Sequence, residues 1–261
     1  MPRPMMHGGR RCGMAHRIVS LHAGYDGPNG FVDGYVGRPA DSGPYPGLVV
    51  ISGMGGLNWF QREMTRTFAR AGFVALSPDL FDGVLPEGRA TQLRYKNSLD
   101  VERTVENLSA GADFLRSLPW TADTAPVGIV GFCLGGGLVL LSLARTNTFG
   151  AGVVYYHSLF PDSEELENIR VPMMCHYGTH DHTTPISEIE AFRAALDRYE
   201  KQYELFMYEG VGHSFLNPNQ DSSERREKAA AESLERTFAF FRNHLGVPAS
   251  AVEDDETPET P

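Results

Sequence analysis

Along this chain, short runs of apolar residues alternate with longer segments in which apolar residues recur every three or four positions. The short runs are typical of buried strands, and the longer segments are typical of helices with one apolar face. Strands that alternate with helices in this way indicate an α/β domain, with a mostly parallel sheet covered by helices on both faces. The predicted strands are residues 47–51, 73–76, 127–130, 150–156, 171–177 and 203–208.

The ends of the helices are also indicated by particular residues. One helix is predicted to end at Gly72, and another, over residues 101–115, to end before Pro119. Asp221 and Glu224 have the spacing of a capping box and are expected to begin the last helix.

The two ends of the chain differ in composition from the segment between them. Residues 1–15 are rich in Gly, Arg, Pro and Met and are predicted to form a flexible leader, whereas residues 247–261, with five acids and no bases, are predicted to be a disordered acidic tail. Residues 16–246 are predicted to form a single domain. Within it, residues 18–21 and 31–36 flank a cluster of Gly, Pro, Asn and Asp, which predicts an antiparallel hairpin at the sheet edge.

A cysteine lies where one predicted strand gives way to an apolar helical stretch. The segment 131–135 reads Gly-Phe-Cys-Leu-Gly, which is the pattern of a nucleophile elbow with cysteine in the central position. Such a turn places the Cys133 sulfur at a helix N-terminus, where unpaired N–H groups favour thiolate over thiol. The sequence therefore predicts that Cys133 is a nucleophile. The alternative is a small buried hydrophobic residue, a common role for cysteine.

An acid and a histidine follow later strands. Asp181 comes after the strand 171–177, and His213 comes after the strand 203–208. The chain order of nucleophile, acid and histidine is that of triads on the α/β-hydrolase sheet, where all three side chains lie at the carboxyl ends of strands. We therefore predict a catalytic triad of Cys133, Asp181 and His213. Taken singly, Asp181 fits a turn residue that bonds to its own backbone, and His213 fits a structural histidine.

The loop after strand 47–51 contains Gly53-Met54-Gly55-Gly56. A phosphate-binding loop would need a following Lys-Ser or Lys-Thr pair, which is absent. The backbone N–H groups of Met54 and of Leu134 are instead predicted to form an oxyanion hole beside the cysteine.

These segments resemble the dienelactone hydrolases (carboxymethylenebutenolidases). The resemblance is carried by residues 131–136, by Asp181-His182 with Pro185, by Tyr208-Glu209 with residues 212–215, by residues 76–81 and by residues 55–58. It covers roughly residues 45 to 245. It implies an α/β-hydrolase fold and a hydrolase that cleaves a small ester or lactone through a thioester acyl-enzyme, without cofactor or metal.

The chain departs from this family where the family recognises its substrate. The family's glutamate that contacts the thiol falls on Gly53 here, and an arginine four residues after the catalytic histidine falls on Asn217. A second substrate arginine has no certain match, although Arg89 and Arg94 are near. These departures predict a weaker demand for a carboxylate on the substrate, and Arg94 is the candidate that would restore it.

Three aromatic residues on loops near the predicted strand ends are candidates for the walls of a substrate pocket: Trp59, Phe81 and Phe215. The alternative for each is an ordinary core position, because aromatic residues also dominate the packing of cores.

Composition narrows the classes of partner. The 261 residues carry a formal net charge of −10, with a pI of about 5.4, and show no basic patch interleaved with aromatics, which argues against nucleic-acid binding. No apolar run approaches the ~18 residues needed to span a bilayer. Three scattered cysteines are too few for a disulfide framework, so a cytoplasmic protein is expected. We expect it to be a monomer or a small homo-oligomer.

Other functions remain open at this point. His176, His180 and His182 suggest a metal site, but no further ligand set elsewhere completes a tetrahedral one, and no metal is expected. A non-catalytic ligand-binding protein on the same fold and a hydrolase for neutral esters unrelated to dienelactone are alternatives. A redox role for Cys133 is disfavoured by the lack of a C-x-x-C partner, with Cys175 inside a predicted strand.

Overall fold

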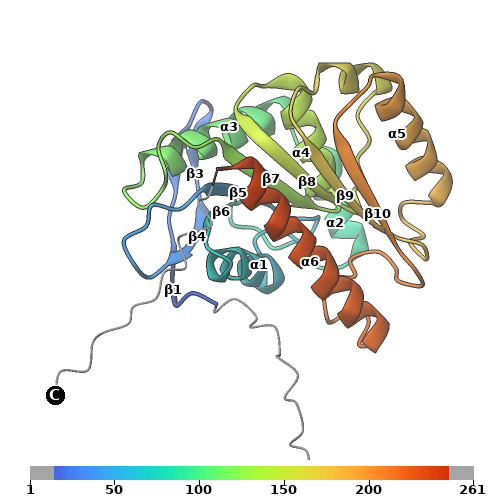
Figure 1. Cartoon of the computed structure of the whole chain (residues 1–261), viewed down its shortest axis with the longest axis horizontal. Helices are drawn as coiled ribbons and strands as arrows, with labels where there is room; N and C mark the ends of the chain where they lie inside the picture. Colours follow the sequence, from blue (N-terminus) through green and yellow to red (C-terminus); the bar gives the residue numbers. More distant parts are fainter. Residues whose placement is uncertain (1–14, 247–261) are drawn as a thin grey trace, which may run out of the picture.

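The computed structural model describes residues 15–246, which fold around a twisted central sheet (Figure 1). Within these residues the sheet has eight strands in the order β1-β4-β6-β5-β7-β8-β9-β10. The strands from β6 to β10 run parallel, whereas β4 pairs antiparallel with both β1 and β6. The bounds are β1 Ile18–His22, β4 Gly34–Pro39, β5 Gly47–Ile51, β6 Val74–Pro78, β7 Val127–Phe132, β8 Phe149–Tyr155, β9 Met173–Gly178 and β10 Tyr203–Tyr208.

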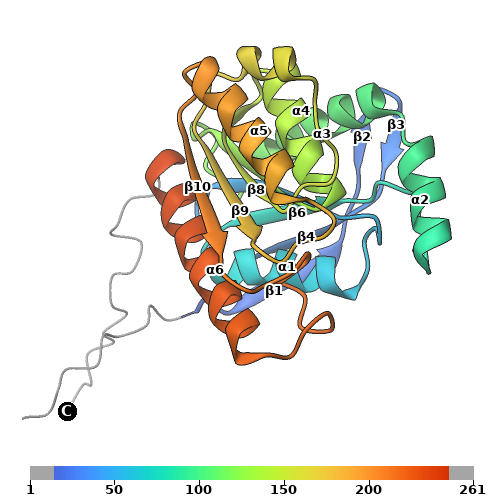
Figure 2. The same cartoon turned by 90° about the vertical axis from the view of Figure 1, so that its right-hand side faces the viewer.

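Helices cover both faces of the sheet, as Figure 2 shows. On one face lie α1 (Trp59–Arg70) and α6 (Glu224–His244); on the other lie α3 (Val101–Ser117), α4 (Leu134–Arg145) and α5 (Ile186–Arg198). The remaining elements are a ribbon of β2 (Tyr25–Gly27) and β3 (Gly30–Val32), the helix α2 (Arg89–Ser98) and a 3-10 helix, η1 (Ser163–Asn168). This arrangement confirms the predicted α/β fold with its mostly parallel, doubly covered sheet. No described helix is long and apolar enough to cross a membrane.

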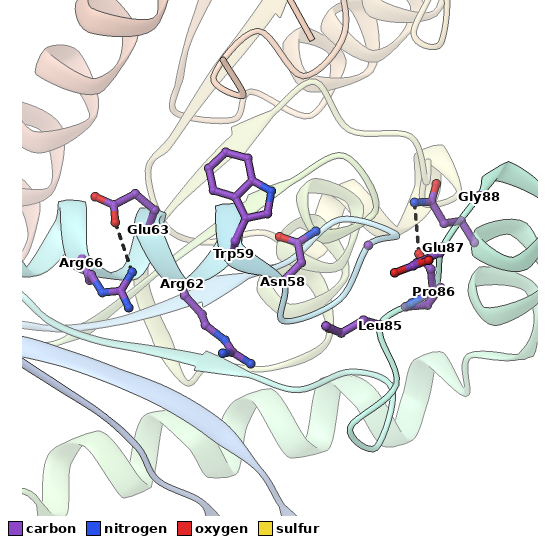
Figure 3. A pocket seen from close by; sticks show the side chains of 11 residues that line it. Asn58, Trp59, Arg62, Glu63, Arg66, Leu85, Pro86, Glu87 and Gly88 are labelled. Carbon is purple, nitrogen blue, oxygen red and sulfur yellow. Dashed lines mark hydrogen bonds and ion pairs between the residues drawn. The ribbon is translucent and has the colours of Figure 1, made fainter. Parts of the chain in front are cut away.

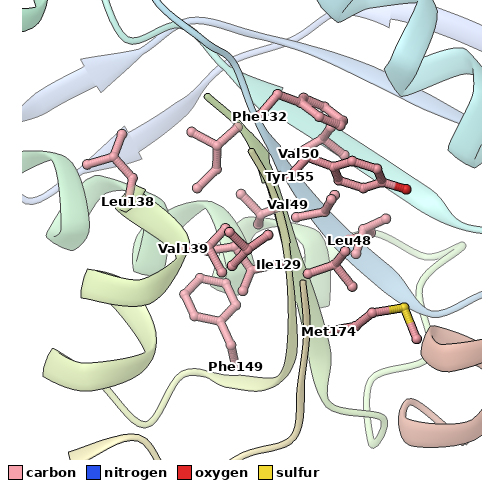
Figure 4. Close-up of a cluster of buried hydrophobic side chains, with 14 of the residues drawn as sticks. Leu48, Val49, Val50, Ile129, Phe132, Leu138, Val139, Phe149, Tyr155 and Met174 are labelled. Atoms are coloured by element: carbon pink, nitrogen blue, oxygen red, sulfur yellow. The ribbon is translucent and has the colours of Figure 1, made fainter. Parts of the chain in front are cut away.

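The central strands are apolar throughout because both of their faces are covered. Every residue of β5, β6 and β7 is buried. Figure 4 shows side chains of β5 and β7 clustered with residues of α4, β8 and β9. A continuous apolar run is the expected pattern for a strand buried on both sides. At Gly128 of β7 the packing is close, since a Cβ there would lie 2.9 Å from side-chain atoms of Leu48, Phe241 and Leu245. Helix α6 therefore docks directly on the sheet at a residue without a side chain.

Two local predictions are corrected by the structure. The predicted antiparallel hairpin at the sheet edge is confirmed, but its second strand is β4, residues 34–39, and not residues 31–36, because residues 25–32 close on themselves as the β2–β3 ribbon. The N-cap of helix α6 lies two residues after Asp221, the first residue of the expected capping box. This N-cap is Ser223, whose hydroxyl accepts from the Arg226 N–H at 3.2 Å, while Asp221 accepts from the Ser223 N–H at 2.8 Å and thereby orients the cap.

Helix α2 has no counterpart among the predicted elements. None of its residues is buried, and it lacks the apolar face by which helices are recognised in a sequence. The leader and tail predictions for residues 1–14 and 247–261 lie outside the described residues.

A close backbone contact at Gly135 offers a test of the fold. A Cβ on Gly135 would lie 2.5 Å from the carbonyl oxygen of Ile51 and 2.7 Å from that of Ser52, and backbone atoms of a buried strand cannot move aside. We expect Gly135→Ala to lower the free energy of unfolding by about 3 kcal/mol, the upper part of the range for overpacked cores.

The measurement is urea denaturation of both proteins. Gly212→Ala is the matched control, because the nearest heavy atom to a Cβ there, the His180 carbonyl oxygen, lies at 3.5 Å, an ordinary van der Waals distance; it should change stability by less than ~0.5 kcal/mol. Equal stability of Gly135→Ala and wild type would show that the turn is not constrained as described.

Candidate active site

Cys133 occupies the turn between β7 and α4 in a conformation that side chains rarely adopt. Its backbone has φ 56° and ψ −113°, a left-handed φ that costs energy in a residue with a Cβ. The turn brings Gly131 so close to the carbonyl of Gly135 that a Cβ at Gly131 would overlap it. The turn can form only because both flanking positions are glycines. This is the predicted elbow, with the thiol at the N-terminus of α4.

The thiol is nearly enclosed but has polar neighbours. Cys133 is 7% exposed, and its Sγ lies 3.3 Å from Oγ of Ser158 in the loop after β8. The Cys133 N–H donates to the carbonyl of Tyr155 at 3.0 Å, which ties the elbow to the neighbouring strand. Burial alone would make Cys133 inert, so its chemistry depends on these neighbours and on His213.

The acid and the histidine meet as predicted. His213 Nδ1 lies 2.8 Å from Asp181 Oδ2, and the Asp181 side chain has no exposure to solvent. The other oxygen, Oδ1, accepts from the N–H groups of Thr183 at 2.7 Å and Thr184 at 3.0 Å. The carboxylate is thereby held in one orientation and directs Nδ1 of the imidazole toward itself. Within residues 15–246, the buried Nε2 of His213 has no hydrogen-bond partner and remains available.

The electrostatics link Cys133 to His213. Burial acts to raise the pKa of the Cys133 thiol, but the neighbouring imidazole of His213 and its charge, the Ser158 hydroxyl and the Leu134 N–H together lower it below its ordinary value. Burial acts to lower the pKa of His213, but its hydrogen bond to Asp181 and the charges of Cys133 and Asp181 raise it to about 9. Both shifts favour a thiolate beside an imidazolium.

The signs of these shifts define a pH window. The raised pKa of His213 stabilises the folded protein below the ordinary value of 6.5, and this contribution is lost as the pH rises through about 9. The lowered pKa of Cys133 contributes stability above its ordinary value of 9.0 and loses it as the pH falls through the lowered value. Together the two shifts favour an ion pair between the lowered pKa of the thiol and about pH 9.

Two backbone N–H groups lie where an oxyanion hole is predicted. Leu134 is the first residue of α4, so its N–H has no partner within the helix. Met54 lies in the loop after β5, and within the described residues its N–H donates to no acceptor. The loop passes beside the nucleophile, because a Cβ on Gly53 would lie 3.3 Å from Cβ and 4.0 Å from Sγ of Cys133.

Comparison with known proteins decides the family. The family model for the dienelactone hydrolase family matches residues 32–245. The chain belongs to the dienelactone hydrolase family. This confirms the resemblance predicted from the sequence, together with the enzyme class, a carboxylic ester or lactone hydrolase.

Individual relatives agree with this membership. A putative carboxymethylenebutenolidase of Azospirillum brasilense is 31% identical over 240 residues, which are 87% of this chain and 99% of that protein. The carboxymethylenebutenolidase of Rhodococcus opacus is 27% identical over 223 residues, 82% of this chain and 87% of the relative. The crystal structure of a putative dienelactone hydrolase from Klebsiella pneumoniae has a TM-score of 0.79 at 22% identity, with 87% of this chain and 99% of that one covered.

The candidate residues for carboxylate recognition do not gather at the thiol. Asn217 closes a local turn, with its side chain accepting from the Asn219 N–H at 3.0 Å. Arg89 and Arg94 are exposed residues of α2, and the guanidinium of Arg94 lies 5.6 Å from the centre of the Tyr95 ring. The structure shows no contact between Arg94 and the three residues of the predicted triad.

The three aromatic candidates have different environments. Trp59 is 52% exposed and lines an open cavity of about 890 Å³ (Figure 3). Phe215 is 1% exposed and packs against Tyr155, Tyr156 and Tyr208, so its prediction as a pocket wall is corrected: it is a core residue below the site. Phe81 is 5% exposed and does not line this cavity.

None of Cys133, Asp181 and His213 lines the cavity in Figure 3. Its link to the thiol is the loop after β5, because Gly55 lines the cavity and Gly53 lies against Cys133. The other lining residues come from the start of α1 and from the segment leading into α2: Asn58, Trp59, Arg62, Glu63, Arg66, Leu85, Pro86, Glu87, Gly88 and Gln92.

Three residues near the thiol were not identified from the sequence. Ser158 contacts the sulfur, and Lys96 of α2 donates from Nζ to the Ser158 carbonyl at 2.9 Å. The ring of Tyr156 packs edge-on against His213 at 5.0 Å between ring centres. Ser158 and Lys96 belong to no motif; Tyr156 belongs to an apolar strand pattern that indicates only burial.

The reactivity of the two buried cysteines should differ. We expect iodoacetamide to alkylate Cys133 well below pH 8.5, the ordinary region for free cysteine, because its pKa is lowered. Cys175 is the internal control, because burial raises its pKa to about 12. Peptide mass spectrometry at pH 6.5 measures both. Labelling of Cys133 as slow as that of Cys175 would contradict the ion pair.

Proposed function

We propose that this chain hydrolyses small carboxylic esters or lactones through a thioester formed on Cys133. The observation that carries the proposal is the set of interactions among residues at the carboxyl ends of β7, β9 and β10. Asp181 accepts a hydrogen bond from His213 at 2.8 Å, and the charges of His213 and Cys133 shift the pKa of each other toward an ion pair. A nucleophile, a base and a group that orients the base are the parts that nucleophilic acyl transfer requires.

The first half of the reaction forms the acyl-enzyme. The Cys133 thiolate attacks the carbonyl carbon, and the carbonyl oxygen takes up negative charge beside the N–H groups of Leu134 and Met54. When the tetrahedral intermediate collapses, the C–O bond to the leaving group breaks, and the imidazolium of His213 gives its proton to the departing alkoxide. In a lactone the alcohol stays attached to the acyl group, so the ring opens.

The second half releases the acid. Neutral His213 removes a proton from a water molecule, and the hydroxide attacks the thioester carbonyl. Collapse of the second intermediate expels the thiolate and returns the ion pair. Asp181 keeps Nδ1 of His213 protonated and stabilises the imidazolium through both halves, as the acid does in other triads. Every proton transfer in this scheme is assigned to His213, the substrate or water.

The charges around the loop after β5 favour a small, largely neutral substrate. The cavity that Gly55 lines also carries an exposed tryptophan, two arginines and two glutamates, whose charges balance. Arg66 is paired with Glu63 at 3.2 Å, and no acidic or basic side chain replaces the family glutamate at Gly53.

Loss of the nucleophile should abolish turnover. We expect Cys133→Ala to lower kcat/KM for an aryl ester by roughly four orders of magnitude or more, and Asp181→Asn by roughly 10²–10⁴, by analogy with other triads. Cys175→Ala, a change at the other buried cysteine, should leave kcat/KM nearly unchanged, and EDTA should have no effect.

Mass spectrometry of the wild type with a slowly hydrolysed ester should show an acyl adduct on Cys133. Undiminished hydrolysis by Cys133→Ala would refute the proposal, and tight ligand binding without any adduct or turnover would favour a binding protein instead.

Substrate charge provides a separate test. Because Gly53 and Asn217 replace charged groups of the family, we expect the methyl ester of a dienelactone carboxylate to be turned over at least as well as the free acid. The measurement is kcat/KM for the pair. A preference of 100-fold or more for the acid, roughly 2.7 kcal/mol, would show that carboxylate recognition persists. Arg62→Ala and Arg94→Ala would then show whether the cavity or α2 supplies the cation.

A further inference from the structure

The loop after β8 is built against the nucleophile. The Ser158 hydroxyl lies 3.3 Å from Sγ of Cys133, and the Ser158 N–H donates to the Cys133 carbonyl at 3.1 Å. Two contacts therefore join the same two residues, one through the side chains and one through the backbone. The backbone contact fixes where the hydroxyl lies relative to the sulfur.

The first turn of α4 leaves no room for this loop to lie elsewhere. A Cβ on Gly136 would lie 2.9 Å from Cβ of His157, and a Cβ on Gly137 would overlap the carbonyl of Leu159. The loop residues on either side of Ser158 are thus packed onto the glycines that follow the elbow. The position of the Ser158 hydroxyl follows from this packing and not from a mobile surface loop.

A third element holds the same loop. Lys96 donates from Nζ to the Ser158 carbonyl at 2.9 Å, across 62 positions of sequence. Lys96 belongs to α2, in which no residue is buried. This bond therefore ties a largely solvent-exposed helix to the loop that touches the nucleophile.

The sulfur has few other groups to stabilise its negative charge. On the side of the β5 loop it meets Gly53, which offers no side chain. Among the described residues, the polar groups that lower the pKa of its thiol are His213, Ser158 and the Leu134 N–H. The serine is the neutral side-chain donor among them, and a hydroxyl that donates to a charged acceptor makes one of the stronger hydrogen bonds in proteins.

We propose that Ser158 is a further catalytic-site residue, whose hydroxyl donates to the Cys133 thiolate and holds the sulfur between His213 and the oxyanion loop, and that Lys96 is a positioning residue that acts through the Ser158 carbonyl. The proposal rests on the proposed function for its catalytic meaning. The hydrogen bond itself has a consequence that needs no substrate: it stabilises the thiolate relative to the thiol.

The pH dependence of alkylation tests this consequence. The rate of Cys133 labelling by iodoacetamide, followed by peptide mass spectrometry from pH 5 to 10, gives the midpoint of thiolate formation. We expect Ser158→Ala to raise this midpoint by about one unit, because a hydrogen bond to the charged form is lost. Ser158→Thr keeps the hydroxyl and should restore the midpoint to within a few tenths of a unit.

A second readout separates this role from a structural one. A thiolate that has lost a hydrogen bond is more basic and intrinsically more nucleophilic. Ser158→Ala should therefore be labelled severalfold more slowly than wild type below the midpoint, but as fast or faster near pH 10. Damage to the fold would not produce this crossing of the two profiles. Ser98→Ala on α2, remote from the sulfur, is the matched control and should reproduce the wild-type profile.

The Lys96 variants test the positioning role. Lys96→Met should shift the midpoint upward by less than Ser158→Ala, and Lys96→Arg, which can still donate to the carbonyl, should shift it less than Lys96→Met. An unchanged midpoint in Lys96→Met would overturn the part assigned to Lys96. An unchanged midpoint in folded Ser158→Ala, verified by circular dichroism, would overturn the role of Ser158.

The outcome is independent of whether the proposed function holds. If the wild type hydrolyses esters and the Ser158→Ala midpoint does not move, the role of Ser158 fails alone. If the midpoint moves but the wild type hydrolyses no ester or lactone, the proposed function fails and the hydrogen bond to the thiolate stands.

Discussion

The backbone at Cys133 is the constraint on which the site depends. A residue with a Cβ is held at φ 56° because its N–H donates to Tyr155 and its carbonyl accepts from Gly136 and Ser158. Strain of this kind persists only where surrounding contacts over-determine the conformation. Here those contacts come from β8, from the first turn of α4 and from the loop after β8. These three segments therefore meet at the elbow. Because its glycines have no side chains, the segments can approach closely enough to contact the sulfur of Cys133.

Two other buried histidines, unlike His213, are kept uncharged by their environment. His157 and His176 both have a pKa lowered to about 3 by burial, so both are neutral. The His176 ring nitrogens lie 3.0 Å from the Tyr208 hydroxyl and 3.1 Å from that of Thr237. His213 differs because Asp181 accepts from it, and the three hydrogen bonds received by Asp181 offset the cost of burying that carboxylate.

The departures from the family lie around the Cys133 sulfur. It meets Gly53 on one side and the neutral hydroxyl of Ser158 on another. A hydroxyl can stabilise a thiolate without competing for the imidazole proton, which a carboxylate would do. This arrangement favours a resting ion pair, and the sulfur has one negatively charged neighbour fewer than in the family.

Much of this protein is evident from the sequence because the relevant signals are local. The strands are continuous apolar runs, and the elbow is a five-residue pattern in which each glycine is required by backbone geometry. Asp181 and His213 are recognisable since each directly follows a strand, and parallel strands bring their carboxyl ends to one edge. The order of the three residues thus implies their proximity.

Only the tertiary structure decided which distant segments are in contact, because no sequence pattern links them. Ser158 lies 25 positions from Cys133, and Lys96 lies 62 positions from Ser158, so neither contact is encoded in spacing. Phe215 follows His213 by two residues, yet its ring turns into a cluster of tyrosines, a direction set by the packing of β8 and β10 around it. Apolar periodicity states that a side chain is buried; only the packed neighbours determine what it is buried against.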